Sequence, residues 1–188
     1  MKLMIAIPTL DYVHFEFVQS LTGLIRRLDG VNYDINFKAG TLVYLARDAL
    51  AMEAMANGYT HVLWLDADMV FKDDVFEKLS AHQAPFVVGA FNGRHGARLP
   101  CVFQKFPDRL KEYPKETFEI DGCGFGCVLM RTEILRDVYR EYGFCFQPTA
   151  DLGEDLAFCY RAKQLGYKLI CDPSVKVGHI GNSIIWPN

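Results

Sequence analysis

The segment from 61 to 68 constrains the fold more than any other part of the chain. The run HVLWL, in which four of five residues are large and apolar, is followed directly by Asp66-Ala67-Asp68. The length and composition of HVLWL predict a buried strand with both carboxylates at its carboxyl end. Side chains at i and i+2 of an extended segment point to the same side, where two carboxylates can reach a divalent cation or ligand hydroxyls. Because burying two anions without a cation or basic partner is costly, this pattern indicates a ligand site more than a solvated turn.

The chain before this segment alternates between strand and helix patterns. Residues 2–7 form an apolar run of strand length that Pro8 ends, and 33–37 form a second, shorter one. Apolar residues at 15–28 follow one helical stripe. Thr41 can cap a further helix, whose expected buried face is Leu45, Ala49, Met52 and Ala56. This order predicts an α/β fold with a central, mostly parallel sheet flanked by helices, in which ligands bind outside the carboxyl ends of the strands.

The rest of the chain continues the pattern less regularly. The expected elements are a helix after Asp73, strands at 86–90, 101–105, 118–121, 125–130 and 167–171, and helices at 132–142 and 151–166. The helix at 151–166 would bury Leu156, Cys159 and Tyr160, and a turn at Asp172-Pro173 would end the last strand. At roughly 150 residues per domain, 188 residues predict one domain over 1–188.

Charge and composition exclude several classes of protein. The chain has 20 Lys and Arg against 23 Asp and Glu, a net charge of −3, so nucleic acid is not an expected partner. The sequence has no signal-peptide pattern and no apolar run of membrane-spanning length, which predicts a cytoplasmic protein. Its six cysteines are then expected to be reduced, and Cys123 and Cys127 lack the further ligands that a structural zinc site needs.

Two other motifs could contribute to chemistry. Glu154 and Asp155 begin a predicted helix, where acidic residues also serve simply to complement the helix dipole. His179 lies between two glycines in VGHIG, after the last predicted strand. A lone histidine is more often a surface or hydrogen-bonded core residue than a metal ligand, although flanking glycines allow close backbone approach.

In order and separation, these pieces resemble the nucleotide-sugar glycosyltransferases of the GT-A fold, particularly the inverting family-2 type. The resemblance covers most of residues 2–181, and the matching segments are IAIPTLD, LARDALAMEAMANGYTHVLWLDADMVF, GCGFGCVLMRTEIL, GEDLAFCYRAKQLGYKL and VGHIG. It implies a single Rossmann-like domain with a nucleotide-binding half at about 1–91 and an acceptor-side half at about 92–188. The implied reaction moves a sugar from a nucleotide-diphosphate donor to a hydroxyl of an acceptor glycan, lipid-linked sugar or protein.

The resemblance also implies roles for individual residues. The donor would contact Pro8, Thr9, Leu10, Arg47 and Asp66. A divalent cation, Mn²⁺ or Mg²⁺, would be held by Asp68 with Asp66 and His179. Asp155 would be the catalytic base and Glu154 a supporting carboxylate, and the acceptor pocket would be lined by Gly122, Cys123 and Gly124.

Elementary chemistry is consistent with these roles. Diphosphate gains negative charge as the glycosidic bond breaks, and a cation stabilises that charge where it develops. Inverting displacement needs a carboxylate to accept the acceptor's hydroxyl proton. The chain departs from the family in having Asp48 where Asn commonly follows the Arg, and no clear acidic residue selects a nucleobase, so the nucleotide stays open. The short segment after His179 also leaves open an acceptor site completed by a second copy of the chain.

Two alternatives use the same residues differently. The string DADMV also matches the motif of haloacid-dehalogenase-type phosphatases, in which the first Asp is a phosphoryl nucleophile. That motif follows the first core strand, whereas about 60 residues with strand and helix patterns precede it here. The other alternative is a non-catalytic module that binds a sugar nucleotide without transferring the sugar.

Overall fold

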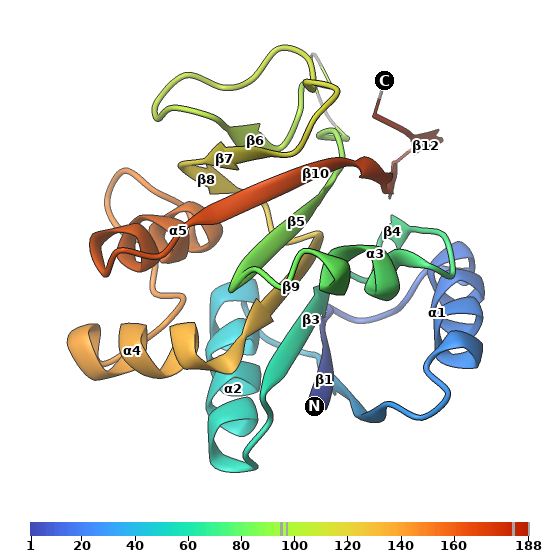
Figure 1. Ribbon diagram of the computed structural model, residues 1–188, viewed down its shortest axis with the longest axis horizontal. Helices are drawn as coiled ribbons and strands as arrows, with labels where there is room; N and C mark the ends of the chain where they lie inside the picture. Colours follow the sequence, from blue (N-terminus) through green and yellow to red (C-terminus); the bar gives the residue numbers. More distant parts are fainter. Residues whose placement is uncertain (95, 97, 182, 188) are drawn as a thin grey trace.

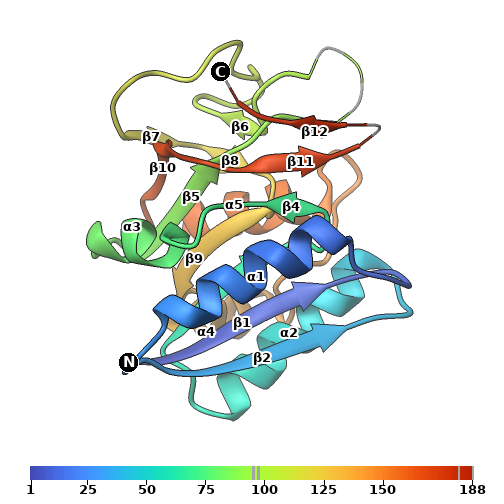
Figure 2. The ribbon, with the colours of Figure 1, turned by 90° about the vertical axis from the view of Figure 1, so that its right-hand side faces the viewer.

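A computed structural model describes residues 1–94, 96, 98–181 and 183–187. Helices cover both faces of a central sheet, with α1 (Phe15–Arg27) and α3 (Val75–Ala81) on one face. The opposite face carries α2 (Val43–Ala56), α4 (Thr132–Tyr142) and α5 (Glu154–Gln164), as Figure 1 and Figure 2 show. The predicted α/β class is therefore confirmed. None of the helices in the described ranges is long and apolar enough to span a membrane.

The central sheet has seven strands, in the spatial order β2 (Asn32–Lys38), β1 (Lys2–Pro8), β3 (His61–Leu65), β9 (Cys127–Arg131), β5 (Phe86–Ala90), β10 (Leu169–Lys176) and β7 (Phe118–Ile120). Strands β2, β1, β3, β5 and β10 run in one direction, and β9 and β7 run in the other. The antiparallel β9 lies between β3 and β5, a placement that the expected parallel order does not contain.

Within the described residues, two small sheets lie beside the central one. The first pairs β4 (Met69–Val70) with β11 (Gly178–Ile180), and β11 with β12 (Ile184–Ile185). In this sheet His179 is opposite Met69, so the chain end returns beside the residues that follow β3. The second small sheet pairs β6 (Val102–Phe103) with β8 (Gly122–Cys123).

Helix α2 buries a different face from the one predicted. Its buried residues are Ala46, Arg47, Leu50, Ala51 and Ala54, whereas Leu45 and Met52 are more than 40% exposed. The helix also begins after Leu42, and Thr41 does not cap it. Because α2 is apolar around most of its circumference, periodicity did not determine its orientation. The small residues pack toward the sheet and carry Arg47 inward with them.

Two further predictions are wrong near the end of the chain. Tyr160 is exposed, and α5 instead buries Ala157, Phe158 and Ala162 together with Cys159. The predicted turn at Asp172-Pro173 does not end the strand, because β10 continues to Lys176. Its register against β5 shifts between Asp172 and Lys176, and this irregularity accommodates the Asp-Pro pair within the strand.

An aromatic cluster forms the part of the core beneath the carboxyl ends of the strands. The Phe125 ring contacts the rings of Trp64, Phe86, Phe146 and Phe158 edge to face, with centroids 5.1 to 6.0 Å apart. All five side chains are fully buried or nearly so. Edge-to-face aromatic pairs stabilise the fold beyond the burial of their apolar surface, so this cluster supports the residues at the strand ends.

Candidate functional site

Arg47 is a buried cation between two carboxylates from distant parts of the chain. Its Nη2 donates to Oδ1 of Asp66 at 2.8 Å, and its Nε faces Oε1 of Glu154 at 3.5 Å. The Arg47 side chain is only 3% exposed. Burial opposes its charge, but the nearby carboxylates Asp66, Glu154 and Asp155 outweigh burial and raise the pKa of Arg47. The residue therefore links the end of β3 to the start of α5.

The other side of the Arg47 guanidinium is incompletely satisfied. Its centre lies 5.3 Å from the centroid of the Phe125 ring, which is a favourable cation–π position. Its Nη1 is buried and has no hydrogen-bond partner among the described residues. An unpaired buried donor on a cation is costly, so this atom is available to an anionic or carbonyl oxygen of a ligand.

The position of Asp66 raises the pKa of its carboxyl group. Burial, opposed by Arg47 and reinforced by Asp68, raises the pKa of Asp66 to about 6. Its backbone N–H donates to the carbonyl of Gly126 on the segment leading into β9, and its own carbonyl accepts from the N–H of Met69. The carboxylate is therefore fixed by backbone contacts on both sides.

Asp68 lies beside a histidine from the other end of the chain. Its Oδ2 is 3.4 Å from Nε2 of His179 and also accepts a hydrogen bond from Nη1 of Arg94. The Asp68 carbonyl accepts from the N–H of Ile180, which ties β11 to this turn. Although burial opposes it, the contacts with His179 and Arg94 lower the pKa of Asp68. Burial also opposes the charge of His179, but Asp68 raises its pKa overall.

Asn92 orients the imidazole ring. Its carbonyl accepts from Nδ1 of His179 at 3.0 Å, which leaves Nε2 directed at Asp68. The side-chain Oδ1 of Asn92 is buried and has no hydrogen-bond partner among the described residues. Histidines that ligate metals commonly have their second ring nitrogen held by a carbonyl in this way.

Glu154 and Asp155 point to different partners. Glu154 faces Arg47, whereas Oδ1 of Asp155 accepts from the N–H of Leu156 at 2.7 Å. Burial and the neighbouring charge of Glu154 raise the pKa of Asp155. A carboxylate with a raised pKa is a better proton acceptor, which suits Asp155 to general-base chemistry.

The loop after β1 is ordered by its own contacts. The Thr9 hydroxyl donates to the carbonyl of Tyr12 at 2.7 Å, and the Thr9 N–H donates to the carbonyl of Lys38. Pro8 is buried, whereas Leu10 is 67% exposed. This loop lies at the carboxyl ends of β1 and β2, on the sheet edge where β3 delivers Asp66.

The Gly122–Gly124 segment packs between α5 and the histidine side of the site. A Cβ on Gly122 would lie 2.9 Å from Cδ2 of Leu156, and one on Gly124 would lie 3.1 Å from the ring of Phe91. Phe91 in turn contacts His179 edge to face at 6.0 Å between centroids. Cys123 is fully buried and unpaired with another cysteine.

The sequence-predicted residues therefore form two clusters and not one. Arg47, Asp66 and Glu154 form the first, and Asp68 and His179 form the second. No group of three or more His, Cys, Asp or Glu side chains suited to a metal ion occurs within the described ranges. Arg94 and Asn92 join the second cluster and were not predicted. Both follow β5, so the strand-end rule that selected Asp66 could have found them.

Comparisons with known proteins show the fold. No protein-family model matches the chain, and no curated protein matches it by sequence. The crystal structure of A197 from STIV has a TM-score of 0.72 at 22% identity, covering all of this chain and 95% of that one. GalNAc-T7, solved with UDP, GalNAc and Mn²⁺, has a TM-score of 0.53 at 15% identity, covering 96% of this chain and 44% of that one. A UDP-glucose pyrophosphorylase complexed with UDP-glucose has a TM-score of 0.54 at 8% identity, covering 92% and 89%.

Proposed function

We propose that the chain is a metal-dependent, inverting glycosyltransferase of the GT-A type, similar to family 2, that uses a nucleotide-diphosphate sugar. The observation that carries the proposal is the pairing of Asp68 with His179 beside the Arg47–Asp66 ion pair, at the carboxyl edge of the sheet. The two nucleotide-sugar complexes among the structures with this fold support the same class of donor. The DxD pair follows β3, the third strand of the chain, which does not suit the phosphatase alternative.

The donor atoms of Asp68 and His179 fit a divalent cation. A carboxylate oxygen and an imidazole nitrogen 3.4 Å apart are close enough to be neighbouring ligands of one ion, and Asn92 holds the ring in the required orientation. Two protein ligands suffice where waters and substrate phosphates complete the coordination, as is common for Mg²⁺. Arg94 contacts the same carboxylate oxygen and supplies a positive charge there. Bound between Asp68 and His179, the cation would stabilise the charge that develops on the leaving diphosphate.

The first cluster would hold the donor. Nη1 of Arg47 has no protein partner among the described residues and can donate to a ribose or diphosphate oxygen. Asp66 would orient Arg47 and accept from a ribose hydroxyl, and this role is compatible with its hydrogen bond to Nη2. The backbone of Pro8, Thr9 and Leu10 would pack on the base and ribose. We assign the metal to Asp68 and His179, with Asp66 at most a minor contributor, because Arg47 already neutralises it.

Asp155 would perform the proton transfer. Its carboxylate accepts the proton of the acceptor hydroxyl as the acceptor oxygen bonds to the anomeric carbon and the bond from that carbon to the diphosphate oxygen breaks. Attack from the side opposite the leaving group inverts the anomeric centre. Glu154 is directed toward Arg47 and would support the donor side instead. Gly122, Cys123 and Gly124 would line the acceptor side of a half spanning about 92–188, opposite a nucleotide-binding half at about 1–91.

A thermal-shift experiment tests the metal and nucleotide roles together. We expect one of UDP, GDP, CDP or dTDP to raise the melting temperature when Mn²⁺ is present and much less when it is absent, because ligands that bind only the folded state stabilise it. Asp68→Asn should abolish the Mn²⁺-dependent part, and His179→Ala should weaken Mn²⁺ binding by about 10- to 100-fold.

Asp29→Asn is the matched control, because it removes one exposed carboxylate and should leave the shift unchanged. A diphosphate shift that is equal with and without Mn²⁺, or unchanged in Asp68→Asn, would overturn the metal assignment.

A further inference from the structure

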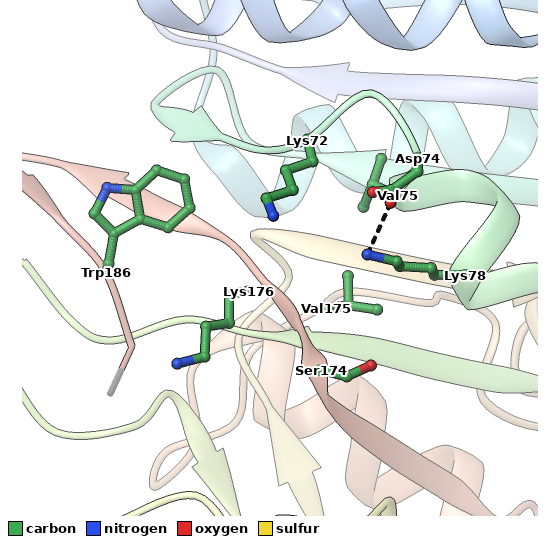
Figure 3. A pocket seen from close by; sticks show the side chains of 8 residues that line it. All are labelled: Lys72, Asp74, Val75, Lys78, Ser174, Val175, Lys176 and Trp186. Atoms are coloured by element: carbon green, nitrogen blue, oxygen red, sulfur yellow. Dashed lines mark ion pairs between the residues drawn. The ribbon is translucent and has the colours of Figure 1, made fainter.

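A pocket of about 310 Å³ lies outside the candidate site. It opens between the start of α3, the end of β10 and the segment after β12, and none of the site residues lines it. Figure 3 shows its lining residues, which are Lys72, Asp74, Val75, Lys78, Ser174, Val175, Lys176 and Trp186. The volume is at the lower end of the roughly 300–1,000 Å³ of small-molecule sites, a size that suits a monosaccharide better than a nucleotide.

The pocket has an excess of positive charge. It contains three lysines and one carboxylate, and Nζ of Lys78 pairs with Asp74 at 2.8 Å, as the dashed line in Figure 3 marks. The hydrogen bond from Lys78 lowers the pKa of Asp74, so this pair is ionised and internally neutralised. The ammonium groups of Lys72 and Lys176 form no ion pair within the described ranges. Figure 3 shows the Lys72 side chain extending into the pocket and the Lys176 side chain extending away from Lys72. Both lysines are exposed, so their side chains can turn toward an anionic group in the pocket.

Trp186 provides a flat apolar surface beside these lysines. Its side chain is 44% exposed, and its ring packs on Gly178, where an added Cβ would lie 3.1 Å from the indole. Gly178 thus allows the ring to lie close to β11. An exposed indole next to polar groups is typical of surfaces that bind amphipathic ligands, and a pyranose ring can stack its C–H face on it. Val75 and Val175 add a buried apolar floor, and the exposed Ser174 offers a hydroxyl.

We propose that this pocket binds a monosaccharide that carries an anionic group, with the sugar ring against Trp186 and the phosphate or carboxylate between Lys72 and Lys176. Charge without a ring would leave the indole uncovered, and a neutral ring would leave two ammonium groups unpaired. The inference concerns binding alone and does not depend on the proposed transferase activity.

The pocket adjoins the candidate site along the chain. Lys72 follows β4 and Lys176 ends β10, while Met69 on β4 pairs with His179 on β11. A ligand that contacts Lys72 and Lys176 would therefore connect the segment after β4 with the end of β10, which leads into β11. The pocket is therefore close to the candidate site along the chain, but none of its lining residues belongs to that site.

Tryptophan fluorescence provides a direct test. Trp64 is fully buried and Trp186 is exposed, so a ligand-induced change reports on Trp186 and should disappear in Trp186→Phe. The titration uses the full chain without nucleotide and with divalent cations chelated. The probes are glucose 6-phosphate, glucuronate, inorganic phosphate and glucose. We expect saturable binding of glucose 6-phosphate or glucuronate, with phosphate and glucose binding at least 10-fold more weakly. The acidic sugar that binds more tightly identifies the anionic group as phosphate or carboxylate.

Calorimetric titrations of variants complete the test. Lys72→Met/Lys176→Met should weaken the acidic sugar at least 10-fold, and added salt should weaken it in the parent protein. Lys168→Met removes an exposed lysine elsewhere and should have no effect. The proposal is overturned if neither acidic sugar binds, if the double variant binds as well as the parent, or if phosphate alone binds as tightly as glucose 6-phosphate. Circular dichroism confirms that each variant is folded.

Discussion

At the residue scale, the molecule keeps a buried arginine charged by surrounding it with carboxylates. Arg47 is paired with Asp66 and Glu154, and one of its nitrogens has no partner in the described part of the chain. Satisfying a buried cation through its ion pairs while leaving one donor free is a costly arrangement for stability alone. A ligand oxygen that accepts from the free nitrogen of Arg47 would account for this arrangement.

The first prediction concerns the pH dependence that Asp66 contributes. Burial raises its pKa from 3.8 to about 6, so its contribution to stability is fully present below about pH 4 and is lost as the pH rises through 6. The free energy of unfolding of the parent minus that of Asp66→Asn should therefore fall by roughly 2–3 kcal/mol between pH 4 and 7. Urea unfolding of both proteins across this range measures it. A difference that stays constant or increases with pH would show that Asp66 is not shifted upward.

The second prediction separates the two acidic residues of α5. Asp155→Asn should reduce turnover on the order of 10²- to 10⁴-fold while donor affinity stays within a few-fold, because a general base acts mainly in the transition state. Glu154→Gln should weaken donor binding instead, since Glu154 contacts Arg47. Steady-state kinetics and donor titrations distinguish these outcomes. If Glu154→Gln abolishes turnover and Asp155→Asn does not, the roles are reversed.

Sequence reasoning selected most of the residues that the structure brings together in the candidate site, but not all of them. Asp66 and Asp68 could be found because a strongly apolar strand precedes them, and their polarity there needs an explanation. Asn92 and Arg94 also follow a strand, β5, but the sequence after β5 loses its periodicity and gives no further reason to select them. Their roles depend on His179, whose position is set by long-range pairing of β11 with β4.

At the element scale, β5 and β10 approach each other closely at Gly89. A Cβ on Gly89 would lie 3.0 Å from the carbonyl oxygen of Val175 and 3.2 Å from side-chain atoms of Val175 and Val177. This crowding occurs at the register shift in β10, which leads into the strand carrying His179. The absence of a side chain at Gly89 therefore allows the backbone of β10 to pass this close to β5.

The third prediction follows from this contact. Gly89→Ala should destabilise the protein by about 1–3 kcal/mol, because the backbone oxygen of Val175 cannot move without disturbing the sheet. Gly23→Ala is the matched control, since its Cβ would only reach ordinary contact with Asp73 in the interior of α1. It should stabilise the protein by up to about 1 kcal/mol through helix propensity. Chemical denaturation measures both, and equal stabilities of the two variants would contradict the packing argument.

Most helices and strands could be predicted at this scale, whereas their faces and partners could not. The helix at Thr132–Tyr142 coincides with its prediction, because its apolar and polar residues are clearly separated. The buried face of helix α2 was predicted wrongly, because apolar residues occur around most of the helix and only tertiary packing selects the face that carries the alanines. The antiparallel insertion of β9 between β3 and β5 is likewise a long-range choice that local pattern does not encode.

At the scale of the whole molecule, the fold brings four segments of the chain to one edge of the sheet. These segments are the loop after β1, the turn after β3 that carries Asp66 and Asp68, the start of α5, and β11, which carries His179. The arrangement of elements is shared with A197 from STIV over nearly the full length of both chains. The order of the motifs along the sequence predicted this convergence, since each motif lies at an element end.

Release of nucleoside diphosphate from nucleotide sugars tests the central claim most directly. The parent protein is incubated with UDP-, GDP-, CDP- and dTDP-sugars, with Mn²⁺ or with a chelator, and the product is quantified. The account predicts slow release from one of these donors that requires the cation, disappears in Asp68→Asn and is unchanged in Asp29→Asn. Donor binding without release, even with acceptor glycans added, would identify a non-catalytic module, and release that is independent of both the cation and Asp68 would contradict the proposed mechanism.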